Sequence, residues 1–146
     1  MTTFLLDVNL LIALFDPVHV HHDPAHEWFT DIRPSRWATC PMTENGVIRI
    51  ISNARYPNSP GTPGAVVGLL AGLRNLSGHV FWPDDISLMH ASIDTSRLLS
   101  AGQVTDTYLL ALAQAHEGQL ATFDRRLVTD AVKNGRMSLH VIGGKL

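Results

Sequence analysis

Residues 3–9 read Thr-Phe-Leu-Leu-Asp-Val-Asn, and the architecture follows from this stretch. Residues 4–6 form a short, unbroken apolar run, which resumes at residues 10–15 after Asp7 and Asn9 interrupt it. Short, continuously apolar strands are typical of a parallel sheet that is covered on both faces. Because ligands gather beyond the carboxyl ends of such strands, we expect a central strand at 3–7 that places Asp7 at a site at its tip.

Asp7 also has a simpler interpretation. Aspartate is among the preferred N-cap residues of helices, so Asp7 taken alone is better explained by capping the next helix than by catalysis. Asn9 is expected at the cap of that same helix. The positions of the other acidic residues therefore carry the functional argument.

The composition predicts one globular domain that spans residues 1–146. Hydrophobic residues make up 45% of the chain and charged residues 16%, which excludes a disordered protein. The formal net charge of −2 counts against nucleic-acid binding through a broad basic face, although local arginines can still contact phosphates. A single cysteine, Cys40, excludes an internal disulfide and a cysteine-based zinc site, and favours the reducing cytoplasm.

The sequence predicts neither secretion nor a membrane-spanning helix. The first strand begins almost at once, without a basic leader before an apolar stretch, so secretion is not expected. No apolar run approaches the roughly 20 residues of a membrane-spanning helix. Residues 145–146, which are either natural or a cloning remnant, are assigned no role.

Short apolar strands alternate with helices along the whole chain. Strands are expected at 3–7, 37–40, 79–82, 119–122 and 139–142. Helices are expected after the first strand, at 25–32, from 43 through 51, from 62 through 73, at about 87–99, at 105–117 and at 125–132. This alternation predicts a three-layer α/β/α sandwich with a central, mostly parallel five-stranded sheet.

Four of the 13 acidic residues occupy places that solubility does not explain. Asp7 ends the first strand, and Asp124 lies two residues past the fourth. Glu44 and Asp106 lie in the first turns of the helices that follow the second strand and precede the fourth. First-turn acids often only complement the helix dipole, so each is individually ordinary. All four together, however, are expected at one rim of a parallel sheet.

Four carboxylates at one rim repel one another. Two unit charges about 4 Å apart retain roughly 4 kcal/mol of repulsion even at an effective dielectric near 20. Such a cluster must take up protons or bind cations, and its hard oxygen ligands select Mg²⁺ or Mn²⁺. Helix amino termini favour the ionised forms of Glu44 and Asp106. Asn9 and Thr105 are candidates to orient carboxylates or bound waters.

These motifs occur in a definite order along the chain: Asp7-Val8-Asn9 near the start, Glu44 after the second strand, Thr105-Asp106 before an apolar helix, and Thr122-Phe123-Asp124 after the fourth strand. In this order and spacing they resemble the PIN-domain nucleases, and more narrowly the VapC ribonuclease toxins of bacterial toxin–antitoxin pairs. The resemblance spans essentially the whole chain. The narrower likeness rests on the small size, the absence of added domains and the segment that contains His22, His26 and Trp28.

The resemblance implies a metal-dependent endoribonuclease. Asp7 and Asp106 would be direct ligands of Mg²⁺ (or Mn²⁺), Asp124 would complete the site, and Glu44 would bind directly or through water. Asn9 and Thr105 match the family's small polar positions beside these acids, and Thr122 is grouped with them. The family also implies an RNA substrate, a homodimer, and inhibition by a cognate antitoxin whose tail enters the acidic groove.

Further candidates lie outside the acidic set. His19, His21, His22 and His26 form a dense cluster, for which a solvated or substrate-facing patch is favoured over a metal site. His22 and His26 are four residues apart and share a helix face. Arg125 and Arg126 adjoin Asp124 and are candidate RNA contacts, although solvated helix faces explain most arginines. Tyr56, in a proline-rich loop, is the aromatic side chain that is most free to stack on a base.

Other classes of function fit less well. A receiver-like signalling domain requires a late lysine after a strand, and neither Lys133 nor Lys145 is so placed. A phosphatase of the Asp-x-Asp type is disfavoured because residue 9 is Asn. A PIN fold that is retained as a non-catalytic binding module remains an alternative, against which the presence of all four acids argues.

Overall fold

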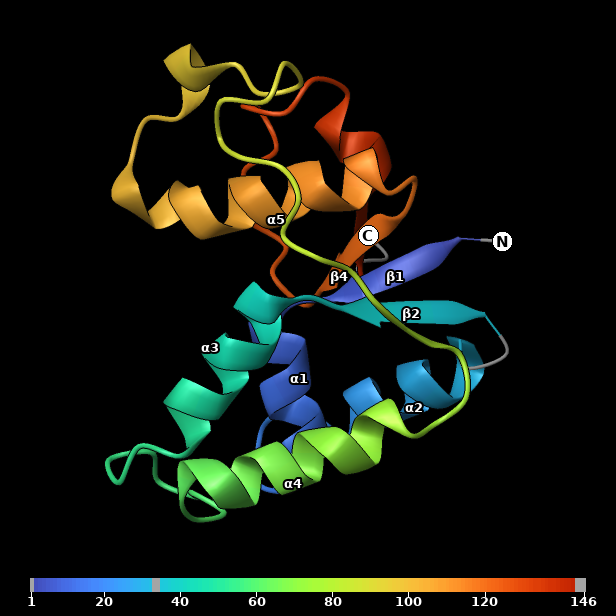
Figure 1. The fold of residues 1–146 in the computed structure, drawn as a ribbon, viewed down its shortest axis with the longest axis vertical. Coiled ribbons are helices and arrows are strands. Elements are labelled where there is room, and N and C mark those ends of the chain that lie inside the picture. The colour runs from blue at the N-terminus through green and yellow to red at the C-terminus, as the bar shows by residue number, and fades with distance from the viewer. Residues whose placement is uncertain (1, 33–34, 144–146) are drawn as a thin grey trace.

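The structure of the protein is a computed structural model that describes residues 2–32 and 35–143. Its centre is a five-stranded sheet in the order β3-β2-β1-β4-β5, and every neighbouring pair is parallel (Figure 1). The strands are β1 Thr3–Leu6, β2 Arg36–Thr39, β3 His79–Phe81, β4 Gln119–Thr122 and β5 Leu139–Val141. All five predicted strands are therefore confirmed to within about a residue at each end, whereas residues 145–146 lie outside the described part.

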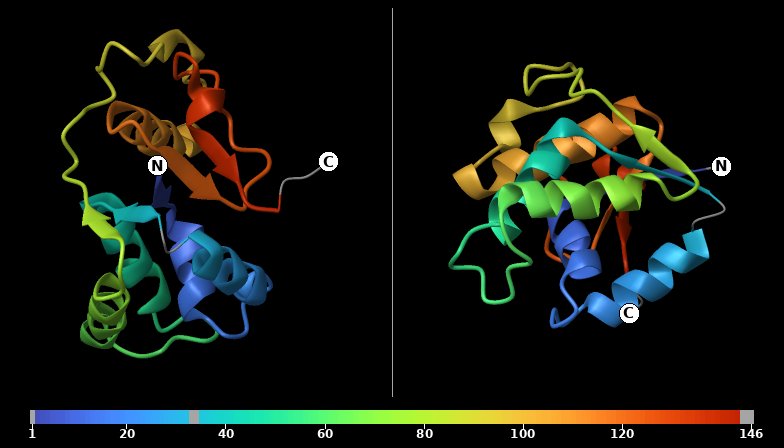
Figure 2. Two further views of the ribbon diagram at one scale, coloured as in Figure 1. Left: turned by 90° about the vertical axis from the view of Figure 1, so that its right-hand side faces the viewer. Right: turned by 60° about the horizontal axis from the view of Figure 1, so that its bottom comes forward.

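Helices cover both faces of the sheet unequally. One face carries α1 Val8–Phe15, α2 His22–Ile32, α3 Pro41–Ile51 and α4 Pro63–Arg74. The other carries α5 Val104–Ala115 and the irregular segments around it, which include the 3₁₀ turns η1 Thr95–Arg97, η2 Ala101–Gln103 and η3 Gly135–Ser138. Figures 1 and 2 show the sheet between these two groups. The three-layer α/β/α class is confirmed.

The central strands are apolar at successive positions because both faces are buried. Leu5 and Leu120 pack into the core beneath α5, whereas Leu6 and Ala121 pack into the core beneath α1–α4. All four side chains have 0% exposure. Burial of a large aliphatic side chain contributes about 1.5–3 kcal/mol, so β1 and β4 anchor the sheet from its middle.

The helix predicted at about 87–99 is wrong. This segment is irregular and contains only η1, because its polar side chains bond to nearby backbone N–H groups and compete with helix formation. The Ser87 Oγ accepts from Met89 N at 3.1 Å, and the His90 Nδ1 accepts from Ser92 N at 3.1 Å. Apolar residues such as Ile93 still pack on the α5 core, but without helical periodicity.

The short helix predicted at 125–132 is also wrong. A carboxylate oxygen of Asp124 accepts from the Arg126 backbone N–H at 2.8 Å, which closes a local turn instead of a helix. Beyond that turn, the segment is joined to residues 92–94, with Asp94 N donating to Ala131 O at 2.7 Å. Residues 124–134 therefore follow the neighbouring loop as irregular backbone.

The described helices include none suited to a bilayer. Across residues 2–32 and 35–143, no helix combines the length and the apolar character that crossing a membrane requires.

Candidate active site

The rim at the carboxyl ends of the strands brings three of the predicted acids together. Asp7 follows β1 directly, Asp124 follows β4 after one residue, and Asp106 lies in the first turn of α5. Since β1 and β4 are adjacent parallel strands, their carboxyl ends meet at the same edge (Figure 1). The fold thus gathers residues that are far apart in the sequence.

Asp7 both caps α1 and belongs to the rim, so the two interpretations of this residue are compatible. Its Oδ1 accepts from the Leu10 backbone N–H at 2.7 Å, whereas Asn9 lies inside α1 and is not the cap. The side chain is only 6% exposed. Burial raises the pKa of Asp7 to about 6, the Thr122 hydroxyl and the Leu10 N–H oppose this rise, and the carboxylates of Asp106 and Asp124 add to it.

Thr122 links two of these acids. Its Oγ1 accepts the Asp124 backbone N–H at 3.0 Å, and its hydroxyl group lies near enough to the Asp7 carboxylate to lower the pKa of Asp7. Thr122 itself has 0% exposure, so its position is fixed by the core. Thr122 therefore positions the backbone of Asp124 at the end of β4.

Asp106 and Asp124 complete an electrostatically coupled set. Burial raises the pKa of Asp106, and the Asp124 carboxylate raises it further. Asp106 is half-buried whereas Asp124 is exposed, so the set opens from a buried acid toward solvent. A carboxyl group whose pKa is raised by burial and by a neighbouring carboxylate is a recurring property of functional sites.

Glu44 is held differently from the other three acids. The Thr39 hydroxyl donates to its Oε2 at 2.6 Å, and Arg74 Nη1 lies 3.2 Å from the same oxygen. The ring of His79 completes this group, with Nε2 2.8 Å from Thr39 Oγ1. Glu44 therefore has an arginine partner of its own, and its place in an acidic quartet stays a prediction.

The donor set suits a hydrated divalent ion better than a tight cage. Within the described ranges, no three His, Cys, Asp or Glu side chains lie close enough together to hold a metal ion directly. The carboxylates of Asp106 and Asp124 nevertheless raise the pKa of Asp7, and that of Asp124 raises the pKa of Asp106, as neighbouring anions do. Mg²⁺ accepts such hard oxygen ligands and usually keeps several waters, which can bridge separated carboxylates.

The two helical histidines bind the end of α1. His22 Nδ1 lies 2.8 Å from Ala13 O, and His26 Nε2 lies 2.8 Å from Leu14 O. These are carbonyls of the last turn of α1, which have no partner within that helix. Both rings thus join α2 to α1, and their predicted contact with RNA stays a prediction.

His21 stacks on Phe123, the residue before Asp124. The two ring centroids are 4.3 Å apart and the rings are almost parallel. This contact brings the histidine-rich loop next to the rim, although the histidines form no metal-binding group with other described residues.

Tyr56 is less free than the sequence indicates. Its hydroxyl donates to the Asp16 carboxylate, which also accepts from Asn58 Nδ2 at 2.7 Å. Asp16 is buried, and a buried carboxylate requires such donors. The prediction that Tyr56 is the most available aromatic side chain is therefore wrong, and its RNA contact stays untested.

Two exposed arginines follow Asp124 in the sequence. Arg125 Nη2 donates to Gly143 O at 2.9 Å, and Arg126 lies in the turn that Asp124 closes. Both line a hollow together with Arg136, for which no RNA contact is predicted from the sequence. Arg74 was also missed, because neither residue stands next to an acidic motif in the sequence.

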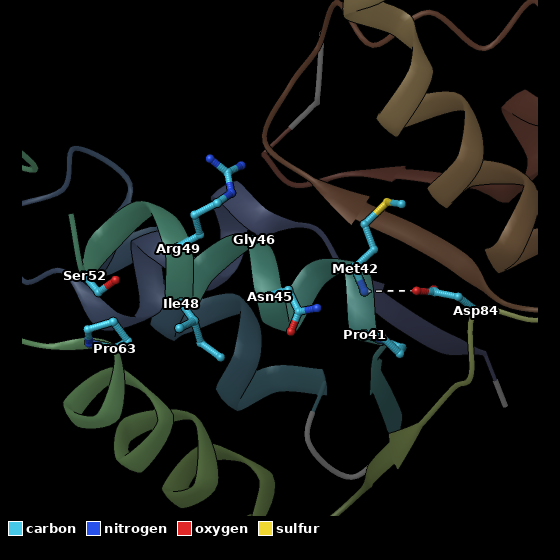
Figure 3. A pocket seen from close by; sticks show the side chains of 9 residues that line it. All are labelled: Pro41, Met42, Asn45, Gly46, Ile48, Arg49, Ser52, Pro63 and Asp84. Carbon is cyan, nitrogen blue, oxygen red and sulfur yellow. Dashed lines mark hydrogen bonds between the residues drawn. The ribbon is translucent and has the colours of Figure 1, made fainter.

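A separate hollow of about 780 Å³ lies along the outer side of α3, and Figure 3 shows its lining. Met42 N donates to an Asp84 carboxylate oxygen at 3.1 Å across it, and Asn45 and Arg49 also line it. None of Asp7, Asp106 and Asp124 contributes to this hollow. The three acids therefore lie outside this depression.

Comparison with known families agrees with this geometry. The family model described as "PIN domain" matches residues 4–131. The chain belongs to the PIN-domain family. Ribonuclease VapC39 of Mycobacterium tuberculosis is 45% identical to this PIN-domain protein over 88% of the chain and 94% of the relative. Ribonuclease VapC44 of the same organism is 46% identical over 88% of the chain and 90% of the relative.

A third relative covers still more of the PIN-domain chain. Ribonuclease VapC38 of Mycobacterium tuberculosis is 39% identical over 94% of the chain and 96% of its own length. The predicted resemblance to the VapC type is therefore confirmed across most of the sequence.

Proposed function

We propose that this VapC-type PIN-domain protein is an Mg²⁺-dependent (or Mn²⁺-dependent) endoribonuclease, the toxin of a toxin–antitoxin pair. The observation that carries the proposal is the position of Asp7 and Asp124 beyond the carboxyl ends of two adjacent parallel strands, where the Asp106 and Asp124 carboxylates also raise the pKa of Asp7. Relatives that are named ribonucleases support it independently. A phosphodiester is the substrate that a cation held by such carboxylates would engage.

The acids have distinct proposed roles. Asp7 and Asp106 would hold the ion directly, Asp124 would complete the site, and Glu44 would bind it directly or through water. When bound, the ion supplies a water of lowered pKa and neutralises charge that develops on the scissile phosphate. Thr122 would position the Asp124 backbone at the end of β4, and Asn9 and Thr105, in the first turns of α1 and α5, are proposed to orient waters.

The partners follow from the VapC type. We propose that the protein forms a homodimer in the cytoplasm and is inhibited by a cognate antitoxin that reaches the acidic rim. Arg125 and Arg126 are proposed to contact RNA, since they are exposed beside Asp124. His22, His26 and Tyr56 are weaker candidates, because each already has a partner within the fold.

The proposal is tested by incubating the purified protein with total RNA in Mg²⁺ and in EDTA, beside the variants Asp7→Asn and Asp31→Asn. We expect discrete fragments only with Mg²⁺, and a loss of at least about 100-fold in cleavage rate for Asp7→Asn. Asp31 is an exposed acid on α2, so its variant should cleave like the unmodified protein. Cleavage in EDTA, or an active Asp7→Asn variant, would contradict the mechanism. RNA binding without any cleavage would favour the non-catalytic module.

A further inference from the structure

A basic groove extends from Arg125 and Arg126, the two residues after Asp124, to arginines that have no role so far. It consists of two adjoining hollows of about 490 and 340 Å³. Both are lined by Thr129, Asp130 and Arg136, so they form one continuous surface. Arg125 and Arg126 lie at one end and Arg97 at the other. We call this surface the arginine groove.

The groove exists because residues 124–134 do not form the helix that the sequence predicts. Leu127, Ala131 and Val132 are buried, and they fix this irregular backbone against the core. Val132 also forms an antiparallel bridge with Ile93, and Lys133 N donates to Ser92 O at 2.9 Å. The floor of the groove is thus built from fixed backbone, above which the arginine side chains are exposed.

The charge of the groove is opposite to that of the whole chain. Residues 123–137 contain four basic and two acidic residues, a balance of +2, whereas the chain has a formal net charge of −2. Among the described residues, Asp130 is the one acidic side chain that lines either hollow. Guanidinium groups bind phosphates in a bidentate manner, so this surface is complementary to a phosphodiester backbone.

The position of the arginine groove indicates which part of an RNA substrate it would bind. Arg125 and Arg126 follow Asp124 directly in the sequence, and Arg125 is anchored by its bond to Gly143 O. A strand whose scissile phosphate lies at the acidic rim would therefore continue along these arginines. We propose that the arginine groove binds the phosphates of single-stranded RNA that flank the cleaved bond; this rests on the proposed ribonuclease function.

The test measures binding of labelled single-stranded RNA to the full-length protein by fluorescence anisotropy in EDTA, which prevents cleavage without a mutation. Arg136→Ala should weaken binding about threefold to tenfold and reduce the slope of log Kd against log salt by about 0.7, the value for one phosphate contact. The matched control is Arg36→Ala. Arg36 is exposed at the amino end of β2, whereas the acidic rim lies at the carboxyl ends of the strands. This control should leave both quantities unchanged.

Oligonucleotide length gives a second, independent readout. An RNA of about 12 nucleotides should respond to Arg136→Ala, whereas one of about 3 nucleotides, too short to leave the acidic rim, should not. An equal effect of Arg136→Ala on both RNA lengths would overturn the proposal that the arginine groove binds RNA. An equal loss of RNA affinity in Arg36→Ala would also overturn it. An unchanged RNA affinity together with weaker binding of an acidic peptide would also overturn it, and would assign the surface to a protein partner.

The outcomes distinguish a failure of the arginine-groove proposal from a failure of the proposed ribonuclease function. If the unmodified protein cleaves RNA in Mg²⁺ but Arg136→Ala binds RNA normally, the groove is wrong and the ribonuclease stands. If Arg136→Ala weakens RNA binding but neither the unmodified protein nor any variant cleaves RNA, the proposal for the groove stands and the proposed ribonuclease function is wrong.

Discussion

Arg74 near the end of α4 forms an ion pair with Glu44 in the first turn of α3, with Nη1 3.2 Å from Oε2. The guanidinium also lies over the Phe81 ring, 4.9 Å from its centroid. Glu44 is 13% exposed and Arg74 is 40% exposed, so the pair is screened by solvent on one side only. The one predicted acid that is not coupled to Asp7 in the structure is thus the one with a cationic partner.

Replacing Arg74 tests whether Glu44 contributes to cation binding. In Arg74→Ala, Glu44 loses its counter-charge, and we expect the dissociation constant for Mn²⁺ to fall about threefold to tenfold if Glu44 faces the ion, because a nearby positive charge opposes cation binding. Mn²⁺ binding is measured by the loss of its free electron-spin-resonance signal. The effect on stability should be small, about 0.5–1 kcal/mol, as for other partly exposed pairs.

Arg49→Ala is the matched control for Arg74→Ala, since it removes an exposed arginine from α3 itself. An unchanged Mn²⁺ affinity in Arg74→Ala would separate Glu44 from the metal site. An equal change in both variants would show only a general effect of net charge.

Asp7→Asn should make the protein more stable at neutral pH while abolishing cleavage. The pKa of Asp7 is about 6 in the folded protein against an ordinary 3.8, so the neutral carboxyl favours the folded state. The raised pKa of Asp7 therefore contributes to the free energy of unfolding below about pH 4, and this contribution is lost as the pH rises through 6. Asn mimics the neutral form and still caps α1, so its advantage should grow to as much as about 3 kcal/mol by pH 8.

This advantage is measured by urea unfolding in EDTA at pH 4 and pH 8, so that no cation neutralises Asp7. The two proteins should differ little at pH 4. A variant that is less stable than the unmodified protein at pH 8 would show that the Asp7 carboxylate is not strained by burial. It would also mean that its loss of activity could reflect poor folding.

Divalent cations should stabilise the unmodified protein selectively. A ligand at 100 times its Kd adds about 2.7 kcal/mol to stability, which corresponds to a rise of about 5–10 °C in Tm at this size. Asp106→Asn should lose most of this rise, whereas Asp31→Asn on α2 should keep it. Thermal unfolding with and without Mg²⁺ measures the effect, and equal shifts in all three proteins would place cation binding outside the acidic rim.

The sequence predicts the sheet well because its signal is local. Runs such as residues 4–6 and 119–122 are short, apolar and bounded by polar residues, and a strand buried on both faces requires this pattern. The carboxyl ends of these strands then locate Asp7 and Asp124 at one rim. The order of the strands across the sheet, β3-β2-β1-β4-β5, does not follow from these runs and comes from the structure alone.

The two wrongly predicted helices and the missed Arg74–Glu44 ion pair have different causes. In the first case side chains hydrogen-bond to nearby backbone, and in the second they pair over a long distance in the sequence. Residues 87–99 and 125–132 contain apolar residues at roughly helical spacing, but Ser87, His90 and Asp124 bond to nearby backbone and form turns. The Arg74–Glu44 pair joins residues 30 positions apart, and no spacing rule indicates it. The arginine groove depends on one of these missed turns, so it is visible only in three dimensions.

His22→Ala and His26→Ala separate a structural role of these residues from a substrate role. Each removes a hydrogen bond to a carbonyl in the last turn of α1, so each should lower the free energy of unfolding by about 1 kcal/mol. Because the rings face Ala13 O and Leu14 O, RNA affinity should change by less than about twofold, well below the loss of a phosphate contact. Urea unfolding and RNA anisotropy on the same preparations decide between the roles. Unchanged stability with weaker RNA binding would restore these histidines as substrate contacts.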